Sequence, residues 1–362
     1  MKTLVLTGGG TLGHCNPCLS IAKSLVGKFD KIVYIGSETG PERKKVEEAG
    51  IPYYPVTTVK FKRELALSNF TIPFKLFDGV RQAERLLKQL SATVVFSKGG
   101  YVSLPVAIAA GRQKVPLILH ESDISLGLAN KLCARYATEV FTTFKETAEK
   151  LSNGIYSGAL VSEEIFGGTK ARGYARYNLV KDKPVLLVLG GSSGSVAINL
   201  AVEKILPKLL EKYSVLHLTG SKNAENNLNF EKYENDVEGK KSYVRVGFES
   251  QMKYAYAVAD VAVTRGGSNC LSELIAMKIP ALIIPLPKNA SRGDQIQNAE
   301  YYKKQGAFRM LLQENITDDL LLKEIDKTYE NRLNLALSQQ KLSKGSKETV
   351  VNGILAAAGI PH

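Results

Sequence analysis

The sequence predicts an α/β protein made of two Rossmann-like domains, and three observations favour this class. Short apolar runs of strand-forming residues recur along the chain, and each is followed by a loop and then by apolar residues at helical spacing. The same pattern restarts at Val185, where a second glycine-rich turn follows the strand. The length of 362 residues exceeds what one hydrophobic core normally organises, which also favours two domains.

In the first half, the apolar run at residues 2–7 predicts a strand that ends in a glycine cluster. Residues 17–29 then carry apolar side chains at helical spacing. Three further apolar runs are each followed by a loop and a helical segment: residues 31–35, 93–97 and 115–120. Strands that alternate with helices predict a parallel sheet with crossover helices.

The second half begins with a predicted strand at Val185–Leu189, a turn at residues 190–195 and a helix at residues 197–210. Four further strands are expected, again alternating with helices: Ser214–Leu218, Tyr243–Val246, Val261–Thr264 and residues 281–285. Residues 165–183 are rich in Gly, Lys and Arg, so we place the domain boundary just before this stretch or within it. The expected domains are therefore residues 1–160 and 161–340.

The composition is that of an ordinary globular protein, with 44% hydrophobic and 23% charged residues. Four cysteines in so long a chain form no disulfide framework, and the apolar stretch after Lys2 runs into three glycines instead of a secretory signal. We therefore expect a reduced, cytoplasmic protein. Residues 3–22 carry no formal charge, but their glycines, His14 and Pro17 would interrupt a membrane helix, so no transmembrane span is expected.

The chain is strongly basic, with 48 Lys and Arg against 35 Asp and Glu and a net charge of +13. This excess favours an anionic partner. Nucleic acid, anionic lipid and a phosphorylated substrate all satisfy it, and charge alone does not choose among them.

Three glycine-rich turns follow predicted strands and open helices, where main-chain N–H groups and the helix dipole favour an anion. Residues 8–13 fit G-x-G-x-x-G, which is compatible with a dinucleotide site that uses Glu38 at the end of the next strand, or with close strand–helix packing alone. The other turns lie at residues 190–195 and 265–269. Three such turns over two halves indicate a ligand cleft. Since the chain has no Asp-x-Asp, we expect main-chain amides and cations, not a metal, to neutralise a diphosphate.

Several single residues admit two interpretations. Glu273 lies in what is predicted to be the first turn of the helix after residues 265–269, where it either complements the helix dipole or binds the hydroxyls of a ribose. His14 and His120 follow predicted strands and are either hydrogen-bonded structural groups or, for His14, a general base. Cys15 and Cys18 have redox or metal-site spacing, but no second Cys/His pair completes a zinc site, so two packed cysteines are expected.

Taken together, these motifs resemble the MurG family, the peptidoglycan N-acetylglucosaminyltransferases that make lipid II. The match runs in order from about residue 4 to about residue 312. The residues that carry it are Gly9, Gly10, Thr11, Leu12, Gly13 and His14; His120, Glu121, Ser122, Asp123, Gly127, Asn130 and Lys131; Gly190, Gly191 and Ser192; Arg265, Gly266, Gly267, Ser272, Glu273, Leu274, Asp294, Gln295, Asn298 and Ala299.

The resemblance implies a glycosyltransferase B fold, in which two Rossmann-like domains face each other across a cleft and a final helix, here about residues 341–362, packs back on the first domain. It implies an inverting transfer of GlcNAc from UDP-GlcNAc to the C4 hydroxyl of muramoyl-pentapeptide-diphosphoundecaprenol (lipid I), without a cofactor or metal. It also implies a peripheral enzyme on the cytoplasmic face of the cell membrane that binds no nucleic acid. Alternatives are a related glycosyltransferase with another lipid acceptor, a sugar-nucleotide epimerase, or an inactive sugar-nucleotide-binding subunit.

The resemblance also implies the site residues. In the C-terminal domain, Glu273 would bind the ribose, the main chain at Glu249 after Phe248 the uracil, and Gln295 with its neighbour Asp294 the sugar. The diphosphate would contact the second and third turns: Ser192, Ser193, Gly267, Ser268 and Asn269. The acceptor region of the N-terminal domain would be lined by Thr11, Leu12, Gly13, His14, Glu121, Asp123 and Asn130. His14 is the first candidate for the base, with Glu121 and Asp123 in reserve.

Residues 60–88 combine seven basic and three acidic side chains with a cluster of apolar ones: Phe61, Phe70, Ile72, Phe74, Leu76 and Phe77. One interpretation places the aromatic residues in the core and the charges on a solvated helix face. The other makes the segment a membrane-binding surface, because a polyprenyl-linked acceptor stays in the bilayer and cations beside apolar side chains suit an anionic lipid surface.

Overall fold

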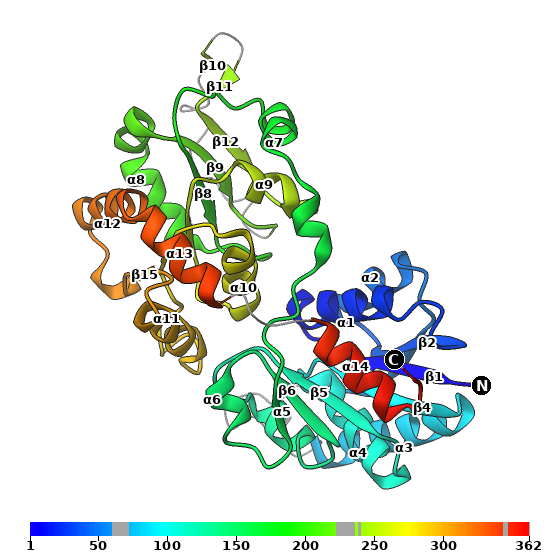
Figure 1. Cartoon of the computed structure of the whole chain (residues 1–362). Helices are drawn as coiled ribbons and strands as arrows, with labels where there is room; N and C mark the ends of the chain where they lie inside the picture. Colours follow the sequence, from blue (N-terminus) through cyan, green and yellow to red (C-terminus); the bar gives the residue numbers. More distant parts are fainter. Residues whose placement is uncertain (60–71, 222–235, 238–239, 343–346, 362) are drawn as a thin grey trace. The chain divides into compact units, whose positions relative to one another are not determined.

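The computed structural model describes residues 1–59, 72–221, 236–237, 240–342 and 347–361. The chain forms two compact units (Figure 1). The first consists of Met1–Val161 and Gly345–His362, and the second of Ser162–Lys344.

The first unit contains a seven-stranded sheet in the order β3-β2-β1-β4-β5-β6-β7, and all of its strand pairs are parallel. The strands are β1 (Thr3–Thr7), β2 (Lys31–Ser37), β3 (Tyr53–Val56), β4 (Ala92–Ser97), β5 (Leu117–Glu121), β6 (Glu139–Thr142) and β7 (Gly154–Tyr156). From β1 the chain adds strands first on one side (β2, β3) and then on the other (β4 to β7). At such a switch point the loops after neighbouring strands diverge, and ligands bind there in folds of this kind.

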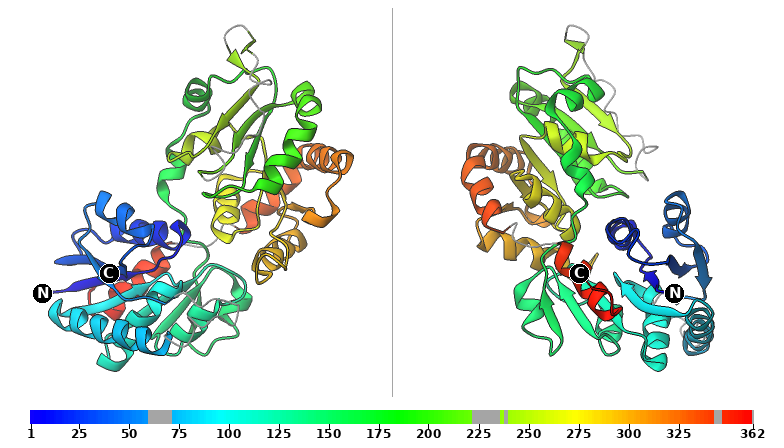
Figure 2. Two further views of the ribbon diagram at one scale, coloured as in Figure 1. Left: turned by 180° about the vertical axis from the view of Figure 1, so that it is seen from behind. Right: turned by 45° about the vertical axis from the view of Figure 1, so that its right-hand side comes forward.

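Helices cover both faces of this sheet (Figures 1 and 2). Successive strand residues point to opposite faces, so Leu4 and Leu6 pack with Ile21 in one core while Val5 packs with Ala83 in the other. The helices are α1 (Leu12–Ser24), α2 (Glu42–Glu48), α3 (Ile72–Gln89), α4 (Leu104–Gln113), α5 (Leu128–Cys133), α6 (Lys145–Ala148) and α14 (Lys347–Ala357), with a short 3-10 helix η2 (Tyr101–Ser103).

The last helix, α14, belongs to the first unit although it follows the second in the chain. Its apolar positions recur at helical spacing, and Val350, Ile354 and Leu355 join the core that contains Leu4 of β1 and Phe141 of β6. The helix starts at Lys347, and the preceding helix, α13 (Arg332–Leu342), lies in the second unit. The first unit therefore needs the end of the chain to complete one of its two cores.

The second unit contains a six-stranded parallel sheet in the order β12-β9-β8-β13-β14-β15. Its strands are β8 (Val185–Leu189), β9 (Ser214–Leu218), β12 (Tyr243–Val246), β13 (Val261–Thr264), β14 (Ala281–Ile283) and β15 (Arg309–Met310), and an antiparallel pair joins β10 (Asp236–Val237) to β11 (Lys240–Lys241). Its helices also lie on both faces of the sheet (Figure 2). They are η3 (Glu163–Gly167), α7 (Lys170–Tyr177), α8 (Val196–Lys212), α9 (Met252–Val258), α10 (Ser268–Met277), α11 (Asp294–Lys304), η5 (Gln313–Asn315), α12 (Asp318–Glu330) and α13.

Most of the predicted elements are present, and the largest difference in bounds is that of one helix. The strands Val185–Leu189, Ser214–Leu218, Tyr243–Val246 and Val261–Thr264 are confirmed to the residue. The helix expected over residues 17–29 was wrong at both ends, since α1 runs from Leu12 to Ser24 and contains Pro17 in its interior. The expected start rested on the helical spacing of apolar residues after Pro17, but Cys15, which precedes the proline, is also buried in the core, so the helix begins before Pro17.

The expectation that Cys15 and Cys18 are packed cysteines is confirmed. Both are fully buried free thiols, and burial raises the pKa of each to about 12. In the part of the chain that the structure describes, no helix is long and apolar enough to span a bilayer.

The return of α14 leads to a stability prediction. We expect Ile354→Ala to lower the free energy of unfolding of the first unit by about 2–5 kcal/mol, because it opens a cavity in the core shared with α1 and β6. Asn352→Ala, on the exposed side of the same helix, is the matched control. Urea unfolding followed by circular dichroism measures both. Equal midpoints for the two variants would mean that α14 contributes little to the stability of the unit.

Candidate active site

The sequence-predicted site residues lie in two groups, one in each unit, at the carboxyl ends of parallel strands. In the first unit, the loops after β1, β4 and β5 come from three neighbouring strands. In the second unit, the loops after β8, β13 and β14 do the same. This is the edge at which open α/β sheets bind ligands.

The first glycine turn is held by a buried carboxylate that sequence analysis missed. Glu42 of α2 accepts hydrogen bonds at Oε2 from the N–H of Gly10 (3.3 Å) and at Oε1 from the N–H and hydroxyl of Ser37 (3.2 and 2.5 Å). The N–H of Gly9 donates to the carbonyl of Gly99 (3.3 Å). Two amides of the turn are therefore occupied by protein acceptors, which disfavours the dinucleotide-binding interpretation, although Glu38 is exposed.

His14 lies in the first turn of α1, half-buried, directly after this glycine turn. Its Nδ1 is hydrogen-bonded to the hydroxyl of Thr11, at 2.9 Å. This bond restrains the rotation of the imidazole, so the ring that we consider as a base is fixed in orientation by its own helix start. Leu12 and Gly13 form the main chain of the same turn.

Two further glycines bring the groups of the first unit together. Gly99 and Gly100 follow β4 with φ of 90° and 84°, a conformation that favours glycine. A Cβ on Gly99 would collide with Asn130, and one on Gly100 with the carbonyl of Gly9, next to the ring of His14. Only the main chain of Gly99 and Gly100 therefore lies between Asn130 on one side and His14 on the other. A glycine pair right after a predicted strand is the signal that could have revealed it.

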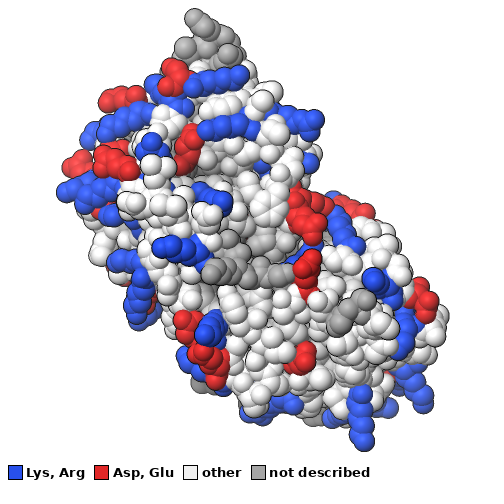
Figure 3. Space-filling view, in the orientation of Figure 1, with Lys and Arg blue, Asp and Glu red and all other residues white. Residues whose placement is uncertain are grey.

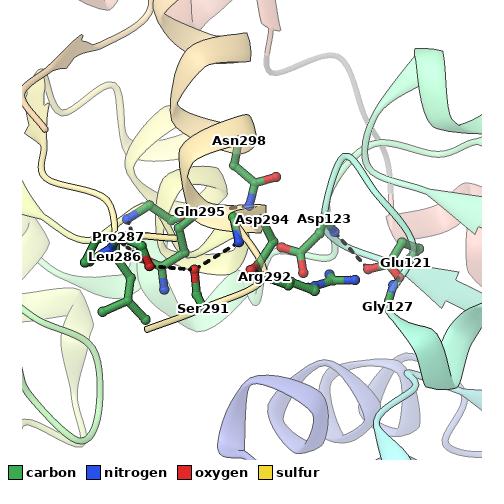
Figure 4. A network of polar contacts seen from close by, with 12 residues as sticks. Glu121, Asp123, Gly127, Leu286, Pro287, Ser291, Arg292, Asp294, Gln295 and Asn298 are labelled. Atoms are coloured by element: carbon green, nitrogen blue, oxygen red, sulfur yellow. Dashed lines mark hydrogen bonds and ion pairs between the residues drawn. The ribbon is translucent and has the colours of Figure 1, made fainter. Parts of the chain in front are cut away.

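Glu121 organises the loop after β5. Its buried carboxylate accepts hydrogen bonds from the N–H of Asp123 (2.9 Å), the N–H of Gly127 (3.3 Å) and Nδ2 of Asn130 (2.9 Å), as Figure 4 shows for the first two. Burial raises the pKa of this carboxyl, and the hydrogen bonds and Lys98 oppose the shift. With both oxygens engaged inside the loop, Glu121 is placed to position Asp123 and Asn130.

The charge that faces Glu121 was also missed from sequence. Lys98 is buried after β4, and its ammonium donates a hydrogen bond to Oγ of Ser122. Burial lowers the pKa of Lys98, while the charges of Glu121 and Asp123 raise it. His120 is fully buried beside this cation, with Nε2 3.3 Å from the carbonyl of Gly158, and both burial and the lysine hold its pKa well below the usual range. His120 is thus a neutral structural group.

In the second unit, the third glycine turn joins β13 to α10. The side chain of Arg265, at the start of this turn, holds it against the loop after β14. The guanidinium of Arg265 is buried and donates from Nη1 to the carbonyls of Ile284 (3.0 Å) and Pro285 (3.2 Å). Burial lowers the pKa of Arg265 to about 10. Gly267 caps α10 with open space where a side chain would stand, so Ser268 and Asn269 begin the helix beside an accessible main chain.

Gln295 of α11 ties this turn to the loop after β14. Its side-chain oxygen accepts hydrogen bonds from the N–H of Gly266 (3.2 Å) and the N–H of Leu286 (3.0 Å), the second of which is drawn in Figure 4. Asp294, which starts the same helix, lies 3.7 Å from the guanidinium of Arg292. The oxygen of Gln295 is therefore occupied by the main chain, and only its amide NH₂ can donate to a ligand.

Glu273 lies in the second turn of α10. The prediction that it lies in the first turn, where it would complement the helix dipole, was wrong. The hydroxyl of Tyr256 on α9 donates to its Oε2, at 2.5 Å. Burial raises the pKa of Glu273 and the tyrosine opposes this shift. Tyr256 was missed because nothing in its spacing relates it to Glu273. The bond orients the carboxylate and leaves Oε1 for a ligand.

The second glycine turn, after β8, is exposed at Ser192 and Ser193. Ser195 caps α8 by accepting a hydrogen bond from the N–H of Ile198 (3.3 Å), and the carbonyl of Ser192 accepts bonds from the N–H and hydroxyl of Ser221 (both 3.1 Å). The turn thus presents side chains outward while its main chain is anchored.

Comparison with known proteins identifies the family. Residues 4–142 match the glycosyltransferase family 28 N-terminal domain, and residues 185–352 match the glycosyltransferase family 28 C-terminal domain. The chain belongs to glycosyltransferase family 28. Each of the two matches falls mainly in one of the two units, so the family assignment covers both groups of predicted site residues.

The chain is also similar to enzymes called UDP-N-acetylglucosamine-N-acetylmuramyl-(pentapeptide) pyrophosphoryl-undecaprenol N-acetylglucosamine transferase. That of Lachnospira eligens is 41% identical over 344 residues, which is 94% of this chain and 95% of the relative. That of Clostridium botulinum strain Loch Maree is 40% identical over 347 residues, 95% of each chain. The resemblance to the MurG family is confirmed by these relatives.

Among solved structures, Acinetobacter baumannii MurG superposes with a TM-score of 0.73 and 25% identity over 98% of this chain and 99% of that chain. The kitacinnamycin glycosyltransferase superposes with a TM-score of 0.72 at 14% identity over 99% of this chain and 98% of that one, which supports the fold alone. The expected glycosyltransferase B class, with two Rossmann-like units, is confirmed.

Proposed function

We propose that this family 28 glycosyltransferase transfers GlcNAc from UDP-GlcNAc to the C4 hydroxyl of lipid I, with inversion at the anomeric carbon. The observation that carries the proposal is the match to N-acetylglucosamine transferases of that specificity along 94–95% of the chain. The related glycosyltransferase with another lipid acceptor, the epimerase and the inactive binding subunit are the alternatives that the experiment below separates.

The second unit supplies the donor site in this proposal. Glu273, oriented by Tyr256, accepts hydrogen bonds from the ribose hydroxyls. The diphosphate lies against the open main chain at Gly267 and against the exposed Ser192 and Ser193. Main-chain N–H groups and the N-terminus of α10 stabilise the charge that develops on UDP as it leaves. No metal is required by this arrangement.

The first unit supplies the acceptor site. His14 removes the proton from the C4 hydroxyl as its oxygen attacks the anomeric carbon, and the bond to the sugar forms while the bond to UDP breaks. Thr11 fixes the ring, and Glu121 fixes Asp123 and Asn130 beside it in the fold. A single displacement inverts the carbon without a covalent enzyme intermediate.

Release of UDP tests this proposal directly. Purified protein is incubated with UDP-GlcNAc, with or without a lipid I analogue, and with or without a chelator. We expect UDP and disaccharide product only when the acceptor is present, and equal rates in chelator. Product with another lipid acceptor only would favour the related glycosyltransferase, and conversion of UDP-GlcNAc without any acceptor would favour the epimerase. UDP binding without turnover would favour the inactive binding subunit. Loss of donor binding in chelator, restored by magnesium or manganese, would overturn the account of the diphosphate.

The membrane proposal depends on α3. Phe74 and Phe77 are 78% and 56% exposed, so the interpretation that places these two in the core was wrong. Lys75, Arg81 and Arg85 are exposed on the same helix, whereas Phe61 and Phe70 lie outside the described residues. Aromatic side chains beside cations suit the surface of an anionic bilayer. We propose that the enzyme binds peripherally, at the cytoplasmic face of the membrane, where lipid I is reached.

Nucleic acid is not part of this proposal. On the face shown in Figure 3, basic and acidic side chains are interspersed, without a continuous basic track on that face. We propose instead that the net charge of +13 favours binding of three other anions: the nucleotide diphosphate, the acceptor diphosphate and the lipid surface.

For the donor site, we expect Glu273→Ala to weaken UDP-GlcNAc binding by about 1–3 kcal/mol, since charged hydrogen bonds to the ribose are lost. Titration calorimetry measures the affinity, and the melting temperature should change little. Glu300→Ala, an exposed acid on α11, is the control and should bind normally. Normal donor affinity in the Glu273 variant would show that this carboxylate has only a structural role with Tyr256.

For the base, we expect His14→Ala to lower kcat by roughly 100-fold or more, the usual scale for a lost general base, with UDP-GlcNAc affinity nearly intact. Asn16→Ala, exposed on the same helix, is the matched control. Steady-state kinetics with the lipid I analogue measures both. If the His14 variant turns over at the control rate, Asp123 becomes the first candidate.

For the membrane surface, we expect reversible binding to anionic vesicles that weakens with salt and with Phe74→Ser combined with Phe77→Ser. Each cation near the surface adds about 1 kcal/mol with anionic lipid, and burial of the aromatic rings adds to this. Phe166→Ser replaces a phenylalanine that is 55% exposed in the other unit and serves as the control. Equal sedimentation with neutral and anionic vesicles, or a double variant that sediments normally, would remove α3 from this role.

A further inference from the structure

We propose that Arg176 is a positioning residue for the nucleobase end of the donor site, where it holds the Phe248–Glu249 loop through the carboxylate of Glu249. The inference rests on the proposed function, because it assumes that the second unit binds UDP. It adds a residue that the sequence motifs do not include, from a helix, α7, that carries none of the predicted site residues.

The carboxylate of Glu249 is saturated by protein donors. Arg176 donates from Nε to Oε2 (2.9 Å) and from Nη2 to Oε1 (3.0 Å), which is a bidentate pair. The hydroxyl of Tyr177 donates to Oε2 (2.8 Å) and the N–H of Gln251 to Oε1 (2.7 Å). The Glu249 side chain is only 2% exposed. Such a buried charge is stable only when its partners are in place, so the four donors fix the loop.

The electrostatics agree with this geometry. Burial alone would raise the pKa of Glu249, but the hydrogen bonds from Arg176, Gln251 and Tyr177 leave it below its ordinary value. The carboxylate therefore stays ionised and bound to its donors at neutral pH. It is not available to accept a bond from a ligand.

Arg176 is itself held against a rigid support. Its guanidinium lies over the ring of Tyr254 on α9, 5.4 Å from the centroid, and near the ring of Tyr177, at 5.9 Å. Gly168 and Gly173 allow the backbones to approach, since a Cβ on the first would collide with the carbonyl of Lys253 and one on the second with Val258. The arginine thus links the loop to the packed pair of α7 and α9.

The loop that Arg176 holds lies where a ligand is expected, after the carboxyl end of β12. Phe248 is 47% exposed, directly before the buried Glu249. Among the residues that the structure describes, no hydrogen bond engages the main-chain N–H or carbonyl of Glu249. A pyrimidine edge carries both an N–H donor and carbonyl acceptors, which these two groups match. Recognition then depends on the position of the main chain, which Arg176 sets before the ligand arrives.

The test uses a set of variants in the full-length protein. Arg176→Met removes the donors and keeps an apolar stem over Tyr254, and Arg176→Lys keeps the charge but not the bidentate geometry. Arg172→Met, an exposed arginine on the same helix, is the matched control. Arg176→Met combined with Glu249→Met replaces the buried pair by apolar groups, so that the fold is kept if the single variant is unstable.

Calorimetry with two probes separates positioning from general damage. We expect Arg176→Met to weaken UDP about 10-fold and Arg176→Lys less, while ribose 5-diphosphate, which lacks the base, binds as to the wild type. The double variant should also weaken UDP, with a normal melting temperature. In turnover, KM for UDP-GlcNAc should rise about 10-fold with kcat little changed.

Three outcomes would overturn the inference. The first is that the Arg176→Met variant binds UDP as tightly as the Arg172→Met control. The second is that Arg176→Met lowers the affinities for UDP and for ribose 5-diphosphate equally. The third is that the double variant binds UDP with normal affinity. If the wild type fails to bind UDP at all, the proposed function fails instead, so the two failures are distinguishable.

Discussion

The loops at the carboxyl ends of both sheets depend on buried acceptors that bind main-chain N–H groups. Glu42 fixes the turn after β1, Glu121 the loop after β5, and Glu249 the loop after β12. A buried carboxylate that lost these donors would be left with an uncompensated charge, which costs several kcal/mol. Each loop is therefore held in one conformation, and the groups beside it, His14, Asp123 and the main chain of residue 249, have fixed positions without a ligand.

The kind of acceptor differs between the turns, and this difference bears on where an anion binds. The turn after β1 is held by the carboxylate of Glu42, which repels a phosphate placed on the same amides. The turn after β13 is held by the neutral amide oxygen of Gln295. A diphosphate can approach the main chain at Gly267 without facing a buried negative charge from its support. The electrostatics thus favour the third turn, not the first, as the place for the diphosphate of a nucleotide sugar.

Strands and glycine turns were predictable because their signals are local. Central strands such as β8 and β13 are continuous apolar runs between turn residues, which is typical of a buried parallel sheet. Short strands toward or at the edges of the sheets were missed: β3 contains a proline, β15 has two residues, and β6 and β7 are short. The missed groups are Glu42, Lys98, Tyr256 and Arg176. Each has at least one hydrogen-bond partner between 17 and 73 residues away, which no spacing rule reveals.

Contacts around the loop after β5 narrow the choice of base. His120 is buried and neutral under the loop, and both oxygens of Glu121 are occupied by donors of the loop that it organises. The N–H of Asp123 is one of those donors, so replacing Glu121 displaces Asp123 as well. A loss of activity in a Glu121 variant would therefore report the position of the loop and not proton transfer. Of the three candidate bases, His14 and Asp123 are partly accessible and are positioned by other residues, so proton transfer has to be tested on these two.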